Sequence, residues 1–255
     1  TDVVAGIVVA FIGFKLTLHL FNKINKPKSI YKINKLNNNY FLLSLVVFCI
    51  LIIFVTVGDT IDIYISGLFY QGNQNFFLQS FYIITIIARK IILPIIVLYL
   101  LIFPIISFFI PLKTIYYKHS FTINEIFLIF FSLFFNLLIV VNLLLKNLWG
   151  RARPNEILQL GGKEAFSPWY EITNACGSNC SFVSGDASVG FSIIILYLIT
   201  KKIIFLYASA FAGLVLGLIR IMAGGHFLSD IFFAGFLIVI LNIVLFELYK
   251  KYYAK

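Results

Sequence analysis

The chain has 255 residues, of which 61% are hydrophobic and only 12% are charged, and its formal net charge is +10. Charged residues make up about a quarter of a soluble domain, so this composition excludes a soluble globular protein and indicates an integral membrane protein. The positive charge does not indicate nucleic-acid binding, because most lysines lie in short connections between apolar segments, where membrane topology accounts for them.

Apolar segments long enough to cross a bilayer as helices, at about 20 residues each, recur along the whole chain. In chain order they cover residues 3–21, 40–58, 83–111, 122–147, 184–200, 203–221 and 228–248. The sequence therefore predicts an all-α integral membrane protein. Its first helix, within residues 1–22, is joined to the rest by a basic linker at 23–39.

The lysines of the connections indicate the orientation of the predicted helices. If every segment crosses, the lysine-rich connections share one side, which is the cytoplasm by the positive-inside rule. These lysines are Lys23, Lys26, Lys28, Lys32, Lys35, Lys113, Lys118, Lys201, Lys202, Lys250, Lys251 and Lys255. Arg89 and Lys90 depart from this pattern, and either belong to a site or are buried in the bundle.

Polar residues gather where four predicted segments reach the opposite side. Lys146, Arg153 and Arg220 are cations without matching carboxylates, and arginine and lysine side chains suit the oxygens of a phosphate group. The fifth segment opens with Ser184 and Gly185, where a hydroxyl and the free N–H groups of a helix N-terminus could also bind an anion. Taken together, these residues predict an anion-binding site, although each alone could be a helix cap or a side chain reaching the lipid head groups.

His226 and Asp230 provide the candidate reactive group. They are four residues apart, so we expect them on one face of a helix, where the carboxylate accepts a hydrogen bond from one imidazole nitrogen. The other nitrogen is then available as a nucleophile or a base. This arrangement favours phosphoryl transfer by a histidine, the alternative being a structural His–Asp pair.

These residues resemble the motifs of the type 2 phosphatidic acid phosphatase superfamily. Lys146 with Arg153 and Pro154 resembles its first motif, Ser184–Asp186 its second, and Arg220, His226 and Asp230 its third. The resemblance implies a six-transmembrane-helix phosphatase core at 40–255, with residues 1–22 as an extra N-terminal helix, either the remnant of an upstream copy or a fusion. It also implies a metal-independent, cofactor-free phosphatase in which His226 is the nucleophile and Asp230 orients it. The phosphate would be held by Lys146, Arg153, Ser184, Gly185 and Arg220.

The second motif departs from the family pattern. Val183 and Asp186 stand where the family has proline and a histidine that protonates the leaving oxygen. Either Asp186 is the general acid or acid catalysis is weak. The third motif also begins with Ile219 in place of the usual serine.

Cys176 and Cys180 lie in the polar loop before Ser184. A disulfide between them is expected if this loop faces an oxidising compartment. A zinc site is disfavoured because no second pair of ligands accompanies them, and no cluster elsewhere has metal-ligand spacing.

The stretches "NLWGRARP", "NCSFVSGDAS", "GGHFLSD" and "DIYISGLFY" narrow the resemblance to the lipid A phosphatases of Gram-negative bacteria, most closely the 4'-phosphatase branch. This implies a multi-pass protein of the inner membrane with its active site on the periplasmic side and a lipid as its partner. Phosphatases of undecaprenyl pyrophosphate, phosphatidylglycerophosphate or phosphatidic acid are alternatives. An anion or proton transporter is the alternative outside the enzymes. The sequence gives no indication of oligomeric state.

Overall fold

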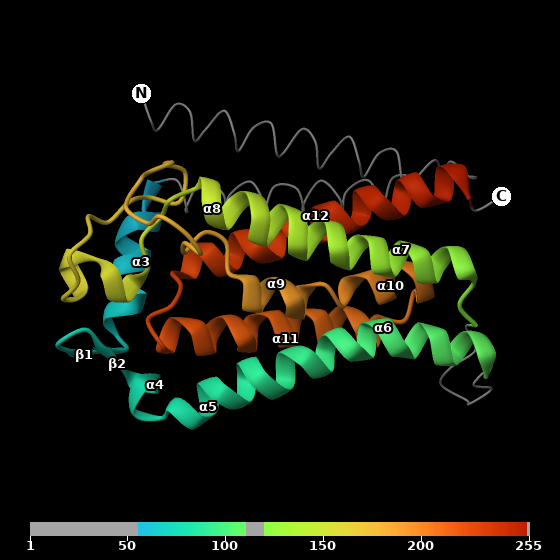
Figure 1. Cartoon of the computed structure of the whole chain (residues 1–255), viewed down its shortest axis with the longest axis horizontal. Helices are drawn as coiled ribbons and strands as arrows, with labels where there is room; N and C mark the ends of the chain where they lie inside the picture. Colours follow the sequence, from blue (N-terminus) through green and yellow to red (C-terminus); the bar gives the residue numbers. More distant parts are fainter. Residues whose placement is uncertain (1–55, 111–119, 254–255) are drawn as a thin grey trace, which may run out of the picture. The chain divides into compact units, whose positions relative to one another are not determined.

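The computed structural model describes residues 56–110 and 120–253, which are mainly helical (Figure 1). The chain divides into two compact units, Thr1–Ile61 and Asp62–Lys255, and the fold below is that of the second. Residues 1–55 lie outside the described residues, so the expected first helix, the basic linker and most of the expected second helix are not described.

The described elements begin with helix α3 and a small antiparallel hairpin, and four long helices follow. Two of these long helices are built from shorter pieces of α-helix and π-helix. The early elements are α3 Gly58–Gly67, β1 Tyr70–Gly72, β2 Asn75–Phe76, α4 Phe77–Ser80, α5 Tyr82–Ile87, π-helix η1 Ala88–Ile92 and α6 Leu93–Phe109. The later ones are α7 Ile123–Leu133, π-helix η2 Phe134–Leu145, α8 Lys146–Leu148, the 3-10 turns η3 Pro154–Glu156 and η4 Leu158–Leu160, α9 Gly185–Phe191, α10 Ile194–Thr200, α11 Ile203–Met222 and α12 Leu228–Tyr252.

Four helices in the described part of the chain are long and apolar enough to cross a membrane. They are Tyr82–Phe109, Ile123–Leu148, Ile203–Met222 and Leu228–Tyr252. These helices confirm the spans expected at 83–111, 122–147, 203–221 and 228–248. The protein is therefore a multi-pass helical membrane protein.

The single helix expected at 184–200 is instead divided into α9 and α10 around Ser192. The hydroxyl of Ser192 donates to the carbonyl of Ser188, and that of Ser188 donates to the carbonyl of Ser184. Hydroxyls that bond back to a carbonyl one turn earlier often bend a helix. Together α9 and α10 form only a short apolar stretch, Gly185–Thr200.

Helix α9 lies among the long helices and packs against α11, α12 and α6 (Figure 1). Its closest approach is to α11, because a Cβ added at Gly190 would lie 2.5 Å from the backbone nitrogen of Gly213. Glycine at this crossing therefore lets the two backbones touch. The contact places the first turn of α9 beside the end of α11, where two of the candidate motifs meet.

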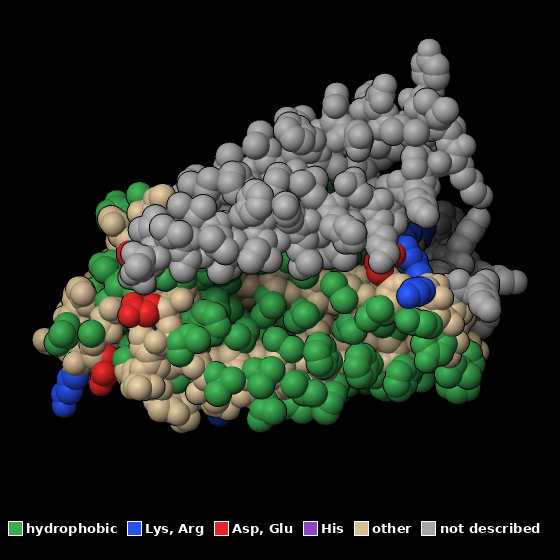
Figure 2. All heavy atoms as spheres, turned by 90° about the horizontal axis from the view of Figure 1, so that it is seen from above, with side chains coloured by type: hydrophobic (Ala, Val, Ile, Leu, Met, Phe, Trp, Pro, Cys, Tyr) green, Lys and Arg blue, Asp and Glu red, His purple; other side chains and the backbone are tan. Residues whose placement is uncertain are grey.

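The core of the long helices is apolar and includes Leu100, Ile129, Leu196, Phe205 and Phe246. Many other large hydrophobic side chains on α5, α6, α7 and α11 are exposed, as expected of surfaces that face lipid. Figure 2 shows hydrophobic side chains over the middle of one face, with charged side chains mainly toward its two ends. This distribution fits a slab of hydrocarbon around the middle of the helices.

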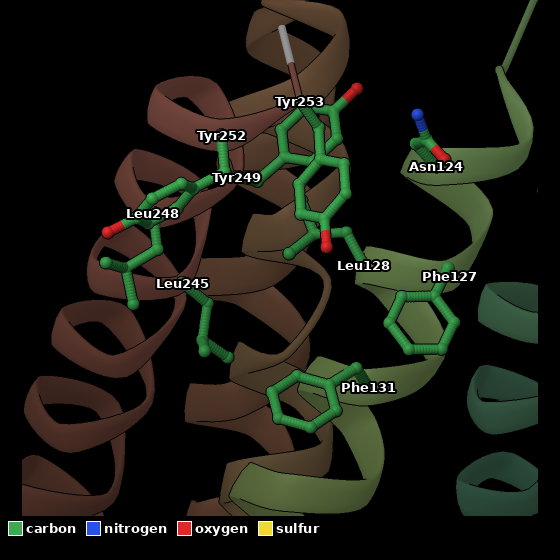
Figure 3. Close-up of a pocket in the computed structure, with 9 residues that line it drawn as sticks. All are labelled: Asn124, Phe127, Leu128, Phe131, Leu245, Leu248, Tyr249, Tyr252 and Tyr253. Atoms are coloured by element: carbon green, nitrogen blue, oxygen red, sulfur yellow. The ribbon is translucent and has the colours of Figure 1, made fainter.

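The two ends of the long helices differ in character. At one end, the loop between α8 and α9 packs with the β1–β2 hairpin over a small core formed by Phe76, Ala152, Ile157, Leu160 and Phe227. At the opposite end, α7 and α12 enclose a pocket (Figure 3). Its lining is mainly apolar and includes Phe127, Phe131 and Leu245. The only titratable side chains in its lining are tyrosines, so the chemistry of the motifs lies at the loop end.

Candidate active site

The first two motifs meet at Lys146, which forms the start of α8 and is 8% exposed. Its Nζ donates to Asn179 Oδ1 at 3.2 Å. A Cβ added at Gly185 would lie 3.3 Å from the same Nζ. The amino group of Lys146 therefore lies directly over the first turn of α9.

Arg153 is brought to the same place by a sharp turn after α8. Gly150 has φ +66, and a Cβ there would lie 1.6 Å from the carbonyl oxygen of Thr173, so only glycine fits this turn. Pro154, at the first position of η3, fixes the chain after the turn. The Arg153 guanidinium donates to the carbonyl of Asn179 at 2.6 Å. Asn179, which the sequence did not single out, thus joins Lys146 to Arg153.

Asp186 is surrounded by cations. Its Oδ2 lies 3.5 Å from Arg220 Nε and 3.4 Å from Arg89 Nε. The charges of Arg153, Arg220 and Arg89 all act on Lys146. These four cations and one carboxylate sum to 4 − 1 = +3. We call Lys146, Arg153, Arg220, Arg89 and Asp186 the cation cluster, and its charge suits a dianion.

Arg89 had two interpretations from the sequence, and the structure places its side chain within the cation cluster, 3.4 Å from Asp186. The side chain is 53% exposed and extends from η1, the π-helical turn between α5 and α6. Single π-helical turns within α-helices occur frequently at functional sites. Arg89 is therefore a candidate binding residue from outside the three motifs.

Ser184 caps α9 and is fully buried. Its hydroxyl accepts from the N–H of Ala187 at 3.4 Å, a long and weak capping bond. Its own backbone N–H donates to the carbonyl of Asp230 at 3.2 Å. This backbone contact connects the second motif directly to the third.

His226 does not share a helix face with Asp230, contrary to our expectation. Helix α12 begins at Leu228, so His226 lies in the preceding turn. The reason is that Asp230, in the first turn, accepts the N–H of Phe227 at 2.8 Å and so fixes the start of the helix. The two side chains still meet, because His226 Nδ1 lies 3.6 Å from Asp230 Oδ2.

Asp230 belongs to a buried polar cluster that the sequence did not reveal. Arg151 lies between two carboxylates, donating to Asp230 Oδ1 at 2.6 Å and to Asp62 Oδ2 at 2.8 Å. Ser181 donates to Asp230 Oδ2 at 2.5 Å, and Ser229 contacts both Asp62 and Arg151. All five side chains are fully buried. We call Asp62, Arg151, Ser181, Ser229 and Asp230 the buried carboxylate cluster.

The buried carboxylate cluster carries at most one net negative charge, because burial raises the pKa of Asp62. One guanidinium and two carboxylates sum to 1 − 2 = −1. Burial alone would lower the pKa of Arg151, but Asp230 and Asp62 outweigh it and raise that pKa. Arg151 therefore stays charged, and the Asp230 carboxylate lies beside the His226 imidazole, where it would stabilise a positive charge developing on that ring.

Burial lowers the pKa of His226 to about 4, against the opposing effect of Asp230. We expect this imidazole to remain neutral until the pH falls to about 4. An unfolded histidine titrates near 6.5, so the native state should lose stability as the pH falls from about 6.5 toward the lower value. NMR of ¹³C-histidine-labelled protein, with His226 assigned through a His226→Gln variant, measures this titration. A midpoint near that of a free histidine would contradict the expectation.

A disulfide joins Cys176 and Cys180, with Cα atoms 5.6 Å apart, as expected from their position in the loop. It closes a small ring that contains Asn179. A ring of this size should contribute about 2 kcal/mol to stability in the chain-entropy account.

The disulfide predicts an alkylation pattern. The chain has three cysteines, so denatured protein prepared without reductant should take up alkylating reagent at one thiol, and reduced protein at three. Mass spectrometry of the intact chain distinguishes these states. Three alkylations before reduction would show that the pair is open in the isolated protein.

In the part of the chain that the structure describes, no group of three His, Cys, Asp or Glu side chains is placed to hold a metal ion. The available groups are an imidazole, a carboxylate 3.6 Å from its Nδ1, and a cluster of cations around Asp186. This arrangement can hold a tetrahedral dianion, with an imidazole as the attacking group.

Comparison with known proteins agrees with this chemistry. The PAP2 superfamily profile matches residues 125–253. The lipid A 4'-phosphatase of Francisella tularensis subsp. novicida (strain U112) is 34% identical over 223 residues, which are 83% of this chain and 97% of that protein. The lipid A 4'-phosphatase of Rhizobium leguminosarum is 35% identical over 96 residues, 36% of this chain and 41% of that protein. No solved structure matches the chain significantly.

Proposed function

We propose that this chain, which belongs to the PAP2 superfamily, removes a phosphate monoester from lipid A, with the 4'-phosphate favoured over the 1-phosphate. The family and the relatives make it a phosphomonoester hydrolase that acts on a membrane lipid. The observation that carries the proposal is the meeting of four cations around Asp186, a site for a dianion, with Lys146 and Arg220 close enough to act on the His226 imidazole.

The first chemical step is attack by His226 on phosphorus. Asp230 lies on the Nδ1 side of the ring, so Nδ1 carries the proton and Nε2 carries the lone pair. Nε2 forms a bond to phosphorus while the bond from phosphorus to the sugar oxygen breaks. The imidazole becomes positively charged, and the neighbouring Asp230 carboxylate stabilises that charge. Lys146, Arg153 and Arg220 balance the charge on the phosphoryl oxygens.

The second step regenerates the enzyme. A water molecule attacks phosphorus and gives one proton to the Asp186 carboxylate, which supplied the proton for the leaving oxygen; the bond between phosphorus and Nε2 breaks, and inorganic phosphate leaves with the imidazole neutral again. Both steps use only side chains and water, so activity is proposed to need no metal or other cofactor. Ser184 and Gly185 would hold the phosphoryl oxygens from the N-terminus of α9.

Asp186 is proposed to protonate the leaving sugar oxygen. In the structure it lies beside Arg89 and Arg220. An arriving phosphate dianion would take these two cations from the carboxylate, and like-charge repulsion would favour its protonated form. The carboxyl group could then donate its proton as the bond to the sugar oxygen breaks.

Asp186→Asn tests this role through the leaving group. General acid catalysis is worth about 10²–10⁴-fold on a poor leaving group, so we expect a loss of that size on lipid A. The loss on p-nitrophenyl phosphate should be small, because its phenolate leaves without a proton. The measurement is the ratio of rates, variant to native, on each substrate. Equal fractional losses on both would assign Asp186 a structural role at the start of α9.

The proposed topology places the active site on the periplasmic side of the inner membrane of a Gram-negative bacterium. It comprises a six-helix core over residues 40–255 and an extra helix within residues 1–22, joined by a cytoplasmic linker at 23–39. The lysine-rich connections support this orientation, because the cation cluster lies at the ends of the helices remote from Lys201 and Lys250. The phosphate would then be reached from the outer leaflet, with the acyl chains left in the bilayer.

Mass spectrometry of lipid A from cells with and without the protein tests the proposed substrate. We expect loss of one phosphate when the protein is present, and fragmentation should assign the loss to the 4' position. Loss of the phosphate at the 1 position would contradict the proposed preference for the 4' position. Unchanged lipid A would contradict the proposal that lipid A is the substrate. A second assay measures phosphate release by purified protein in the presence of EDTA, which tests metal independence. Comparing the rates on lipid A, undecaprenyl pyrophosphate, phosphatidylglycerophosphate and phosphatidic acid ranks the alternative substrates. A transporter would release none.

A further inference from the structure

A polar pocket opens in the loop region beside the cation cluster. Its volume of about 580 Å³ lies within the range of small-molecule sites, about 300–1,000 Å³. Its side-chain lining includes Gln74, Asn155, Glu156, Lys163 and Glu164. All of these residues lie outside the four candidate membrane spans. A ligand in this pocket is therefore a head group and not an acyl chain.

The pocket continues directly from the phosphate-binding residues. Asn155 and Glu156 follow Arg153, and Glu156 accepts the backbone N–H of Arg153 at 2.8 Å. On the other wall, Cys176 and residues 177–178 precede Asn179, whose side chain and carbonyl bind Lys146 and Arg153. Both stretches of the lining thus adjoin, along the chain, a residue that belongs to the cation cluster or binds it. A molecule whose phosphate occupies that cluster would extend its adjoining part into the pocket.

The walls of the pocket are fixed by backbone hydrogen bonds. The carbonyl of Glu156 accepts from the N–H groups of Lys163 and Glu164, each at 2.8 Å. Gln74 of the hairpin turn donates to the carbonyl of Gly161 at 2.7 Å, and Cys176, which also lines the pocket, is joined by a disulfide to Cys180. The N–H of Asn155 donates to the carbonyl of Gly224, just before His226. The pocket is thereby held in place relative to the reacting group.

The charge of the pocket selects the kind of ligand. Lys163 against Glu156 and Glu164 gives 1 − 2 = −1, so a second phosphate would be repelled. Carboxylates and amides are good acceptors for hydroxyl groups. Asn155 Oδ1 is buried and has no hydrogen-bond partner among the described residues, and a ligand hydroxyl donating to it would satisfy this acceptor.

We infer that this pocket binds the sugar next to the phosphate that is removed, through hydrogen bonds from its hydroxyl groups to Glu164 and Asn155. The inference rests on the proposed function and deepens it by naming the residues that recognise a saccharide head group. It explains why a catalytic apparatus that could serve any phosphomonoester would prefer a phosphorylated sugar. The acyl chains of that lipid would remain in the bilayer.

The first experiment compares two substrates that share a phosphate monoester but differ in the sugar. Purified full-length protein with Glu164→Gln or Asn155→Ala is assayed on lipid A and on phosphatidic acid. A hydrogen bond to a charged or buried acceptor is worth about tenfold or more, so the loss of kcat/KM on lipid A should exceed that on phosphatidic acid by about this factor. Glu171→Gln is the matched control, because Glu171 lies exposed in the same loop but does not line the pocket. Equal losses on both substrates would overturn the inference.

The second experiment separates binding from turnover. A glucosamine disaccharide without phosphate is added to native protein that is hydrolysing p-nitrophenyl phosphate. Steric exclusion of the aryl phosphate should give competitive inhibition, weakened about tenfold or more by Glu164→Gln. If the disaccharide inhibits but lipid A is not hydrolysed, the inference that the pocket binds a sugar is supported and the proposed substrate is wrong. Hydrolysis of lipid A without inhibition, and without an effect of the variants, would overturn the pocket alone.

Discussion

His226→Ala is expected to abolish turnover, with a loss of kcat of about 10⁴–10⁶-fold, as when the nucleophile of a hydrolase is removed. His226 is the one histidine in the described part of the chain, and it lies between the cation cluster and the buried carboxylate cluster. Its loss removes the atom that would carry the phosphoryl group. Phosphate release from lipid A by the purified variant measures the effect.

Two further measurements make this test specific to a phosphohistidine. Native protein quenched during turnover of ³²P-labelled substrate should carry an acid-labile, base-stable label, which His226→Ala should lack. His119→Ala is the control, because His119 falls in an expected cytoplasmic connection, outside the described residues. Turnover by His226→Ala within tenfold of native protein would exclude His226 as the nucleophile.

Arg151→Met is expected to cause the largest loss of stability. The guanidinium is 0% exposed and joins Asp62 to Asp230. Its removal leaves two buried carboxylates without a cation, and breaking such a pair costs about 3–5 kcal/mol. Thermal unfolding of the purified variant in detergent should show a lowered midpoint. Activity should fall as well, because Asp230 would lose the partner that fixes its position beside His226.

Arg153→Met is the matched control, since the same substitution is made two residues along the same loop. Arg153 is only partly buried and belongs to the cation cluster. We expect it to weaken substrate binding with little effect on the unfolding temperature. Adding Asp62→Asn to Arg151→Met should recover part of the lost stability, because one unpaired carboxylate is removed. Strictly additive losses in the double variant would mean that Asp62 and Arg151 are not coupled.

Much of the helical framework could be predicted because hydropathy alone fixes long apolar helices. The expected span at 122–147 is the helix Ile123–Leu148. The cations and the His–Asp pair could also be found, because charged residues at the ends of apolar segments are conspicuous in a chain of this composition. The structure brings Lys146, Arg153, Asp186 and Arg220 together, as the sequence predicted for the three cations.

The rest of the site depends on contacts between distant parts of the chain. Arg151 and Arg153 are two residues apart, and the conformation at Gly150 decides which of them turns into the protein. Arg151 meets Asp62 from 89 residues away, and no local pattern indicates that partner. The sequence offered one signal for this partner: an acidic residue within "GDTIDIYISG". That stretch is predicted to lie at the extracytoplasmic face, and its acidic residues are close to apolar ones. The position of His226 also escaped prediction, because the start of α12 is fixed by Asp230 itself.

The buried carboxylate cluster has a consequence for biogenesis. A polypeptide emerges from the ribosome with its N-terminal part first, at about 5–20 residues per second. Asp62 and Arg151 are therefore made well before Ser229 and Asp230, which complete their hydrogen bonds. Until α12 is inserted into the membrane, Arg151 lacks one of its two carboxylate partners, and His226 lacks the neighbouring Asp230 carboxylate. Nascent chains would consequently be inert toward the surrounding lipid until the last helix is inserted.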